Sequence, residues 1–395
     1  MVNSKYLALG TKRSVIRELF EYGKKRKAEI GEENVFDFSL GNPSIEPPKS
    51  LNKSIIDHLS KDNAISLHGY TSAQGDQSVR IAIAKTIAEN FSFDISPDLI
   101  YMTCGAAASL TITLSAICQK GDKVLAFAPF FPEYGVFTST AGADFDYVLP
   151  DKDMGIDFAD LEKKLDATVK AVIVNSPNNP SGVVYDEKSV KTLAEILRKK
   201  EKEFSHPIYI VSDEPYRELT YGAKVPFMFN YYDDAIICYS YSKSLSVPGE
   251  RIGYIAVSPK AQDHSDIYFA VCGAGRALGY VCAPSLMQKV IADCQGETTD
   301  IEKYKENRDL LCSALCGFGY KFAKPDGAFY LFVESPSGDG DEFSERAKKH
   351  EILIVSGKGF GVGNYARIAY CVDKKTIERS LPSFKALMDE YKKGI

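Results

Sequence analysis

Lys243 stands at a point in the sequence where a charged amine can be used for chemistry. It follows the apolar run 235–239 directly, in a turn of small and hydroxyl-bearing residues. An amine at the end of a buried strand is partly desolvated, which lowers the pKa of the lysine and makes it a nucleophile toward carbonyl groups. Most lysines are only solvated surface charges, so Lys243 becomes informative through the residues that accompany it.

Three other charged residues lie in or beside apolar runs. Asp213 ends the run PIYIVSD, Arg251 follows Lys243 by eight residues, and Arg367 lies inside the strand-like run YARIAY. A charge that is buried with an apolar run is costly unless it is paired. If these three charges are buried, a polar ligand could therefore be the partner that they need. The alternatives are a turn or helix cap for Asp213, an ordinary surface ion pair for Arg251 and a structural ion pair for Arg367.

Several uncharged residues occupy turns that suit a ligand. In YMTCGAAASLT, a strand leads through a tight turn into a helix that begins with Gly105, Ala106 and Ala107. Free backbone amides and the helix dipole make such a start an anion site. Asn179 lies in the turn NNPSG, and Phe131 follows the run LAFA. Each feature has a simpler alternative. The glycine turn could be an ordinary strand-to-helix turn, Asn179 could lie in a proline-rich loop without a ligand, and Phe131 could be a core aromatic residue.

The elements that must position these residues alternate between strand and helix. From about residue 98 to 258, six apolar runs are separated by helical stretches, which predicts a three-layer α/β/α domain with a mostly parallel sheet. Ligands of such sheets bind at the carboxyl ends of the strands. The C-terminal part predicts a smaller α+β domain. We therefore expect an N-terminal segment 1–40 packed on the small domain, a large domain 41–285 and a small domain 286–395.

The composition excludes several classes of protein. The 395 residues include 48 basic and 53 acidic side chains, without the basic excess typical of nucleic-acid binding. Nine cysteines without a CxxC pair, and five scattered histidines, disfavour disulfides and a metal site. No apolar stretch is long enough for a membrane span, and the first residues lack the pattern of a signal peptide. We expect a cytoplasmic protein.

The segment SYSKSLSVPGERIGY, residues 240–254, resembles the Ser-x-x-Lys signature of fold-type I pyridoxal-phosphate enzymes, the aspartate aminotransferase family of class I and II. The resemblance implies that Lys243 forms the internal aldimine with pyridoxal 5'-phosphate. It also implies that the phosphate is bound by Ser240, Arg251 and the helix start at Gly105, Ala106 and Ala107. Motifs in the family's order extend from Gly41 to Arg367.

Further motifs resemble those that hold the cofactor ring. The SDExY pattern implies that Asp213 keeps the ring nitrogen charged and that Tyr216 hydrogen-bonds the phenolic oxygen. Asn179 matches the asparagine of the family's NPTG motif, here NPSG, and is a second partner of that oxygen. Phe131 stands where the family usually stacks tryptophan or tyrosine on the ring, and this chain has no tryptophan.

The same resemblance implies a substrate site shared between two subunits. Gly41 and Arg367 would bind the substrate α-carboxylate beside Asn179, and Tyr70 would reach the phosphate of the neighbouring subunit in a homodimer. Arg276 lies near the place where other members contribute an arginine to the side-chain carboxylate across the dimer. Ala107 replaces the lysine that one aspartate-specific subgroup uses for that purpose.

The activity implied is transamination between an L-amino acid and a 2-oxo acid, with 2-oxoglutarate as one acceptor and ping-pong kinetics. A pyridoxal-phosphate-dependent C–S β-lyase of the same fold requires the same lysine and aspartate, and stays open as an alternative. A regulator that binds the cofactor without turnover is a further alternative, although only about 35 residues precede the core, too few for the DNA-binding domain such regulators carry.

Overall fold

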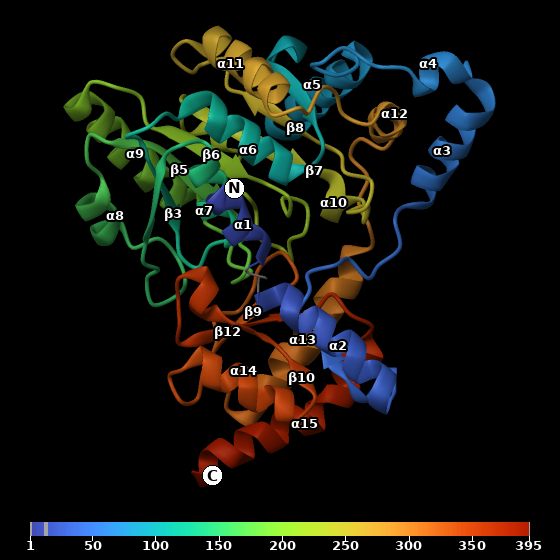
Figure 1. The fold of residues 1–395 in the computed structure, drawn as a ribbon, viewed down its shortest axis with the longest axis vertical. Helices are drawn as coiled ribbons and strands as arrows, with labels where there is room; N and C mark the ends of the chain where they lie inside the picture. Colours follow the sequence, from blue (N-terminus) through green and yellow to red (C-terminus); the bar gives the residue numbers. More distant parts are fainter. Residues whose placement is uncertain (1, 12–14, 395) are drawn as a thin grey trace.

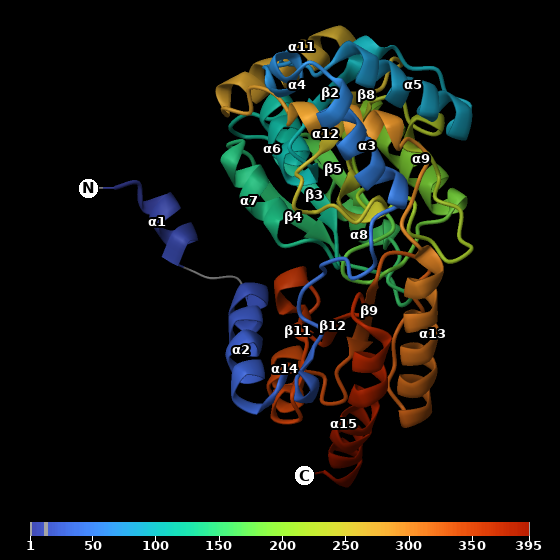
Figure 2. The same ribbon diagram turned by 90° about the vertical axis from the view of Figure 1, so that its right-hand side faces the viewer.

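A computed structural model describes residues 2–11 and 15–394 of the chain, so part of the predicted N-terminal segment 1–40 lies outside the described residues. Two units stand one above the other (Figures 1 and 2), and in Figure 2 the N-terminal helix α1 (Ser4–Thr11) lies to the left of the lower half of the upper unit. The predicted boundaries at residues 40/41 and 285/286 stay a prediction.

The larger unit contains a seven-stranded sheet in the order β2-β8-β7-β6-β5-β3-β4. Every adjacent pair is parallel except those of β8, which is antiparallel to both its neighbours. The strands are β2 (Ile100–Thr103), β3 (Lys123–Phe127), β4 (Asp144–Val148), β5 (Val169–Asn175), β6 (Tyr209–Asp213), β7 (Ala235–Ser240) and β8 (Gly253–Val257). The mostly parallel α/β sheet predicted from the sequence is confirmed. The six predicted runs omit β4, an edge strand whose sequence DFDYV is interrupted by two aspartates.

Helices cover both faces of this sheet. In Figure 2, α6 and α7 lie on one side of the strands, and α5 and α9 lie on the other. The helices of this unit are α3 (Lys49–Lys61), α4 (Ala64–His68), α5 (Gln77–Phe91), α6 (Ala106–Ile117), α7 (Glu133–Thr140), α8 (Phe158–Lys164), α9 (Glu187–Phe204), α10 (Tyr241–Ser244), α11 (His264–Ala277) and α12 (Ser285–Asp293). Aspartate side chains cap α5, α8 and α9, whereas α6 begins at Gly105 without a side-chain cap.

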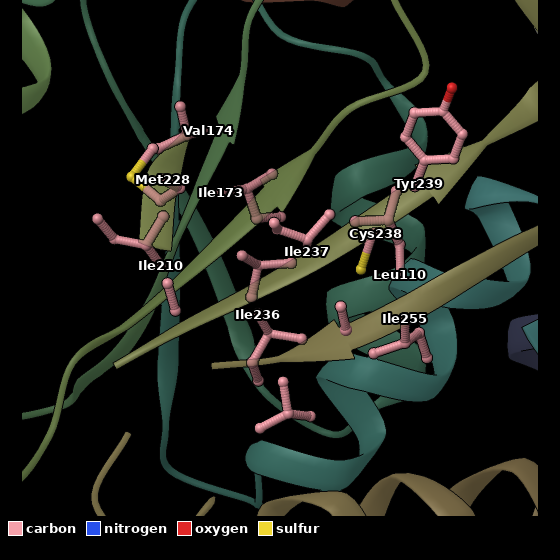
Figure 3. Close-up of a cluster of buried hydrophobic side chains, with 14 of the residues drawn as sticks. Leu110, Ile173, Val174, Ile210, Met228, Ile236, Ile237, Cys238, Tyr239 and Ile255 are labelled. Carbon is pink, nitrogen blue, oxygen red and sulfur yellow. The ribbon is translucent and has the colours of Figure 1, made fainter. Parts of the chain in front are cut away.

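The core of the larger unit is formed by the central strands and the helices against them. Figure 3 shows Ile173 of β5, Ile210 of β6 and Ile236 of β7 clustered near Leu110 of α6 and Ile255 of β8. Each such side chain contributes about 1.5 to 3 kcal/mol when it is fully buried. This packing fixes the strands, and with them the polar residues at their carboxyl ends.

The smaller unit combines segments from both ends of the chain. Its sheet has the order β11-β12-β9, and the short β1 pairs with β10 in parallel. The elements are α2 (Val15–Ile30), β1 (Phe36–Asp37), α13 (Ile301–Phe318), β9 (Tyr330–Glu334), α14 (Gly340–Lys349), β10 (Ile352–Leu353), β11 (Val355–Ser356), β12 (Tyr365–Ala369) and α15 (Lys374–Lys393). The side chain of Arg26 on α2 forms a salt bridge with Glu351, which joins the N-terminal segment to this unit.

Candidate active site

A cavity of about 1420 Å³ lies where the carboxyl ends of β5, β6 and β7 meet the smaller unit. Its wall includes eleven of the residues predicted from the sequence: Gly41, Ala106, Ala107, Phe131, Asn179, Asp213, Tyr216, Ser240, Lys243, Arg251 and Arg367. These residues come from distant parts of the sequence, and the fold brings them into one space. Gly105 lies directly beside this wall, as the residue that precedes Ala106.

Lys243 lies on α10, a single helical turn that starts directly after β7. The hydroxyl of Ser240 caps this turn by accepting the backbone N–H of Ser242 at 3.2 Å. The Lys243 ammonium donates to the carbonyl of Gly41 at 2.8 Å. Burial lowers the pKa of Lys243 to about 8, and the nearby cations Arg251 and Arg367 add to this effect. About a tenth of the amine population is therefore neutral and nucleophilic at pH 7, far more than for a lysine with the usual pKa near 10.4.

Asp213 is buried at the end of β6 and presents one oxygen without a partner. Its Oδ2 accepts the Tyr134 hydroxyl at 2.5 Å, whereas Oδ1 has no hydrogen-bond partner among the described residues. Burial raises the pKa of Asp213 to about 7, against the Tyr134 hydrogen bond, and the neighbouring Glu214 charge raises it further. A buried acceptor of this kind suits a cationic N–H donor, such as a protonated ring nitrogen.

The start of α6 and Arg251 form an anion site on the wall. The N-cap residue Gly105 has a φ of 88°, and an added Cβ would lie 3.0 Å from Arg251 Nη2. The guanidinium therefore lies close over the turn, and its Nη1 donates to the carbonyl of Pro248. With the hydroxyls of Ser240 and Ser242, which are 2.8 Å apart, these donors suit a phosphate group.

Arg367 is a fully buried cation on β12. Its Nη1 donates to Asn179 Oδ1 at 3.1 Å and its Nη2 to the carbonyl of Ser39 at 2.5 Å, while Nε has no partner among the described residues. Within those residues, none of the salt bridges involves Arg367. Burial lowers the pKa of Arg367. Because a buried cation is costly without a counter-charge, the arrangement suits a carboxylate ligand.

Two aromatic residues complete the predicted wall. The Tyr216 hydroxyl lies 3.0 Å from the Tyr330 hydroxyl, and both residues are buried. The ring of Phe131 packs edge-to-face on Tyr134, with centroids 5.8 Å apart. Phe131 thus borders the cavity close to the tyrosine that bonds Asp213.

Tyr70 and Arg276 lie outside the cavity of their own chain. Tyr70 is 93% exposed, and Arg276 is exposed on α11. Neither lines the cavity wall. Their predicted roles require a second subunit and stay predictions.

Sequence reasoning did not assign three residues of this site. Tyr134 bonds Asp213, and Tyr330 contacts Tyr216. Asn175 donates to the Asp213 carbonyl at 2.9 Å and accepts the backbone N–H of Asn179 at 2.8 Å. Asn175 ends the strand VIVN, so its position after an apolar run was a usable signal. Tyr330 lies inside the apolar run GAFYLFVE, where a tyrosine is typical of core.

Residues 2–11 and 15–394 contain no group of three or more His, Cys, Asp or Glu side chains that could hold a metal ion. The same residues include no helix with the length and apolar character of a membrane span.

The chain matches the family model described as aminotransferase class I and II over residues 33–384. It is 29% identical to a probable aspartate aminotransferase of Methanocaldococcus jannaschii, over 96% of this chain and 98% of that protein. It is 28% identical to the aspartate aminotransferase of Thermotoga maritima, over 93% and 95%. The crystal structure of an amino transferase from Eubacterium rectale superposes with a TM-score of 0.98 at 52% identity, over 99% of both chains.

The cavity fits the cofactor of that family on its own geometry. It offers an amine at Lys243, a buried acceptor at Asp213 Oδ1 and a group of anion donors at the start of α6 and Arg251. These groups match the carbonyl, the ring nitrogen and the phosphate of pyridoxal 5'-phosphate. The chain therefore belongs to the class I and II aminotransferases and is a pyridoxal-phosphate-dependent enzyme of transamination.

Proposed function

We propose that this enzyme transfers the amino group of an L-amino acid to 2-oxoglutarate, with aspartate as the first candidate donor, in active sites shared by the two subunits of a cytoplasmic homodimer. The names of the relatives support aspartate as donor. One observation supports the chemistry most directly: a partly buried amine with a lowered pKa, Lys243, shares one cavity with an unpartnered Asp213 oxygen and the buried cation Arg367.

In this proposal each residue has a separate task. Arg367 binds the substrate α-carboxylate, with Asn179 and the Gly41 backbone beside it. Lys243 attaches the cofactor and, once the substrate amine replaces it, moves the proton at the α-carbon. The cofactor supplies an electron sink for that proton transfer, and Asp213 keeps its ring nitrogen protonated. Tyr216 and Asn179 orient the phenolic oxygen, and Phe131 stacks on the ring. The start of α6, together with Ser240 and Arg251, binds the phosphate.

The test is the absorbance spectrum of the purified enzyme with pyridoxal phosphate, before and after adding single L-amino acids. We expect a visible band that an amino donor converts to the aminated form and that 2-oxoglutarate restores. Lys243→Ala should abolish the conversion, whereas Lys260→Ala, which removes an exposed lysine above Phe93, should not.

The outcome separates the proposal from its alternatives. Ammonia and pyruvate released without any 2-oxo acid would indicate a lyase, and a bound cofactor that no amino acid converts would indicate binding without turnover. A donor panel in which aspartate reacts more slowly than apolar amino acids would exclude aspartate as the preferred donor. Cell fractionation tests the location.

A further inference from the structure

Tyr330 contacts both Arg367 and Tyr216 in the wall of the cavity. Its ring lies beneath the Arg367 guanidinium, 4.8 Å from centroid to cation, and its hydroxyl lies 3.0 Å from that of Tyr216. The residue is 2% exposed at the start of β9. A Cβ on Gly41 would lie 1.9 Å from the Tyr330 oxygen. The hydroxyl therefore lies tightly against the glycine whose carbonyl accepts the Lys243 ammonium.

A proton count gives the direction of the contact between the two hydroxyls. Each tyrosine hydroxyl has one proton to donate. In the proposed function, Tyr216 donates its proton to the phenolic oxygen of the cofactor. The contact between the tyrosines is then a hydrogen bond only if Tyr330 donates and Tyr216 accepts.

The charges around the pair favour the same direction. Burial raises the pKa of Tyr330 to about 12, and the cation of Arg367 opposes this rise. Burial raises the pKa of Tyr216 well above its usual value, and the Tyr330 contact raises it further. The Arg367 guanidinium lies directly over the Tyr330 ring, and a cation in this position favours Tyr330 as the donor of the pair.

We propose that Tyr330 is a positioning residue whose hydroxyl donates to Tyr216 and directs the Tyr216 proton toward the phenolic oxygen of the cofactor, while its ring supports the Arg367 guanidinium. The inference rests on the proposed role of Tyr216 and gives a function to a residue for which the sequence indicated only core packing. In a buried chain of hydroxyls, each donor strengthens the next. Loss of the Tyr330 hydroxyl therefore weakens the hydrogen bond that Tyr216 makes.

The experiment is a spectrophotometric pH titration of the holoenzyme without amino acid, for wild type and Tyr330→Phe. A donor to the phenolic oxygen stabilises its negative charge most when the adjacent Lys243 nitrogen has lost its proton. Weakening that donor should raise the apparent pKa of the visible band by about 0.1 to 0.7 unit, which is about 10 to 30% of a hydrogen bond to a charged oxygen. The KM for the amino acid should stay within about twofold, because phenylalanine keeps the ring beneath Arg367.

A matched control removes a similar hydroxyl elsewhere. Tyr320 is buried in the smaller unit, donates to the Phe384 carbonyl at 2.8 Å and does not line the cavity. Tyr320→Phe should leave the titration unchanged. In a Tyr216→Phe background, Tyr330→Phe should add no further shift, because the two hydroxyls act in series.

A second variant covers the case in which Tyr330→Phe does not fold. A fluorinated tyrosine placed at position 330 keeps the ring and makes the hydroxyl more acidic, so the apparent pKa should move down instead of up. Titrations indistinguishable from wild type, or a change in KM alone, would overturn the proposal. Because the titration needs only bound cofactor, a failure of transamination is seen separately, in the response of the spectrum to amino acids.

Discussion

At the scale of single residues, the cavity holds two ionisable groups whose pKa values are shifted toward each other. Burial lowers the pKa of Lys243 to about 8 and raises that of Asp213 to about 7. Both shifts follow from desolvation, because a low-dielectric site disfavours the charged form of either group. A bound cofactor would reverse the balance at Asp213, because a protonated ring nitrogen held by Asp213 would favour the carboxylate. The apoprotein therefore has a buried aspartate in an unfavourable charge state above neutral pH.

This unfavourable state predicts a pH dependence of stability in the apoprotein. An unfolded aspartate has a pKa near 3.9, so between about pH 4 and 7 the folded state binds the Asp213 proton more tightly than the unfolded state does. The free energy of unfolding should then fall as the pH rises through this window. From pH 5 to 8, wild type should lose about 1 to 3 kcal/mol more than Asp213→Asn, which stays neutral throughout. Urea titrations of both apoproteins at several pH values measure the difference.

The control for this prediction is Asp153→Asn, which removes an exposed carboxylate near Lys152. Its stability curve should run parallel to that of wild type. If the free energies of unfolding of wild type and Asp213→Asn change with pH in the same way, Asp213 has an ordinary pKa in the folded apoprotein and the prediction is wrong.

At the scale of elements, the parallel strands explain why the sequence predicts so much of the site. β5, β6 and β7 are adjacent and parallel, so the residues that follow them meet at one edge of the sheet. Asn179, Asp213 and Lys243 could be placed together on this basis. Tyr330 could not, because it reaches the cavity through the packing of β9 in the other unit, which no local pattern encodes. Tyr134 needed the same kind of tertiary information, since α7 meets β6 only in the folded chain.

The start of α6 gives a prediction for an element. Alanine at position 105 would place a Cβ 3.0 Å from Arg251 Nη2, in a backbone with a φ of 88°. We expect Gly105→Ala to weaken pyridoxal-phosphate binding by about tenfold or more, because it displaces the guanidinium that we propose to bind the phosphate and strains the turn. Equilibrium titration of the apoprotein with the cofactor measures this affinity.

Gly121 offers a matched control for the backbone strain. Its φ is 97°, and an added Cβ meets no atom within 4 Å. Gly121→Ala should cost stability by about 1 kcal/mol through the same unfavourable φ, but leave cofactor affinity unchanged. Equal affinity losses in both variants would mean that general destabilisation, and not Arg251, causes the effect.

At the scale of the whole molecule, the cavity is formed by residues from both ends of the chain. Its wall extends from Leu9 in α1 to Arg367 in β12, and the short pairing of β1 with β10 joins the N-terminal segment to the smaller unit. The fold class and the cofactor followed from ordered motifs in the sequence. The wall contributed by α1 and α2 could not be predicted, because these helix-prone residues contain no motif of their own.

The exposure of Tyr70 gives a prediction about assembly. At 93% exposed, the tyrosine is far more open than a site residue should be, and in a shared-site homodimer it would serve the partner's phosphate. Two inactive or weak variants, Tyr70→Ala and Lys243→Ala, are therefore expected to complement each other. In a mixed dimer, one site would carry both lesions and the other would carry neither.

Equal amounts of the two variants, unfolded and refolded together, should regain about a quarter of wild-type activity, because about half of the dimers are mixed and each has one intact site. Each variant refolded alone is the control. If Tyr70 acts within its own subunit, the mixed dimer has one site without Lys243 and one without Tyr70, and activity stays at the average of the two variants. If the protein is a monomer, mixing changes nothing and sedimentation shows a single 43.6 kDa species. Recovery above that average therefore requires that one subunit complete the active site of the other.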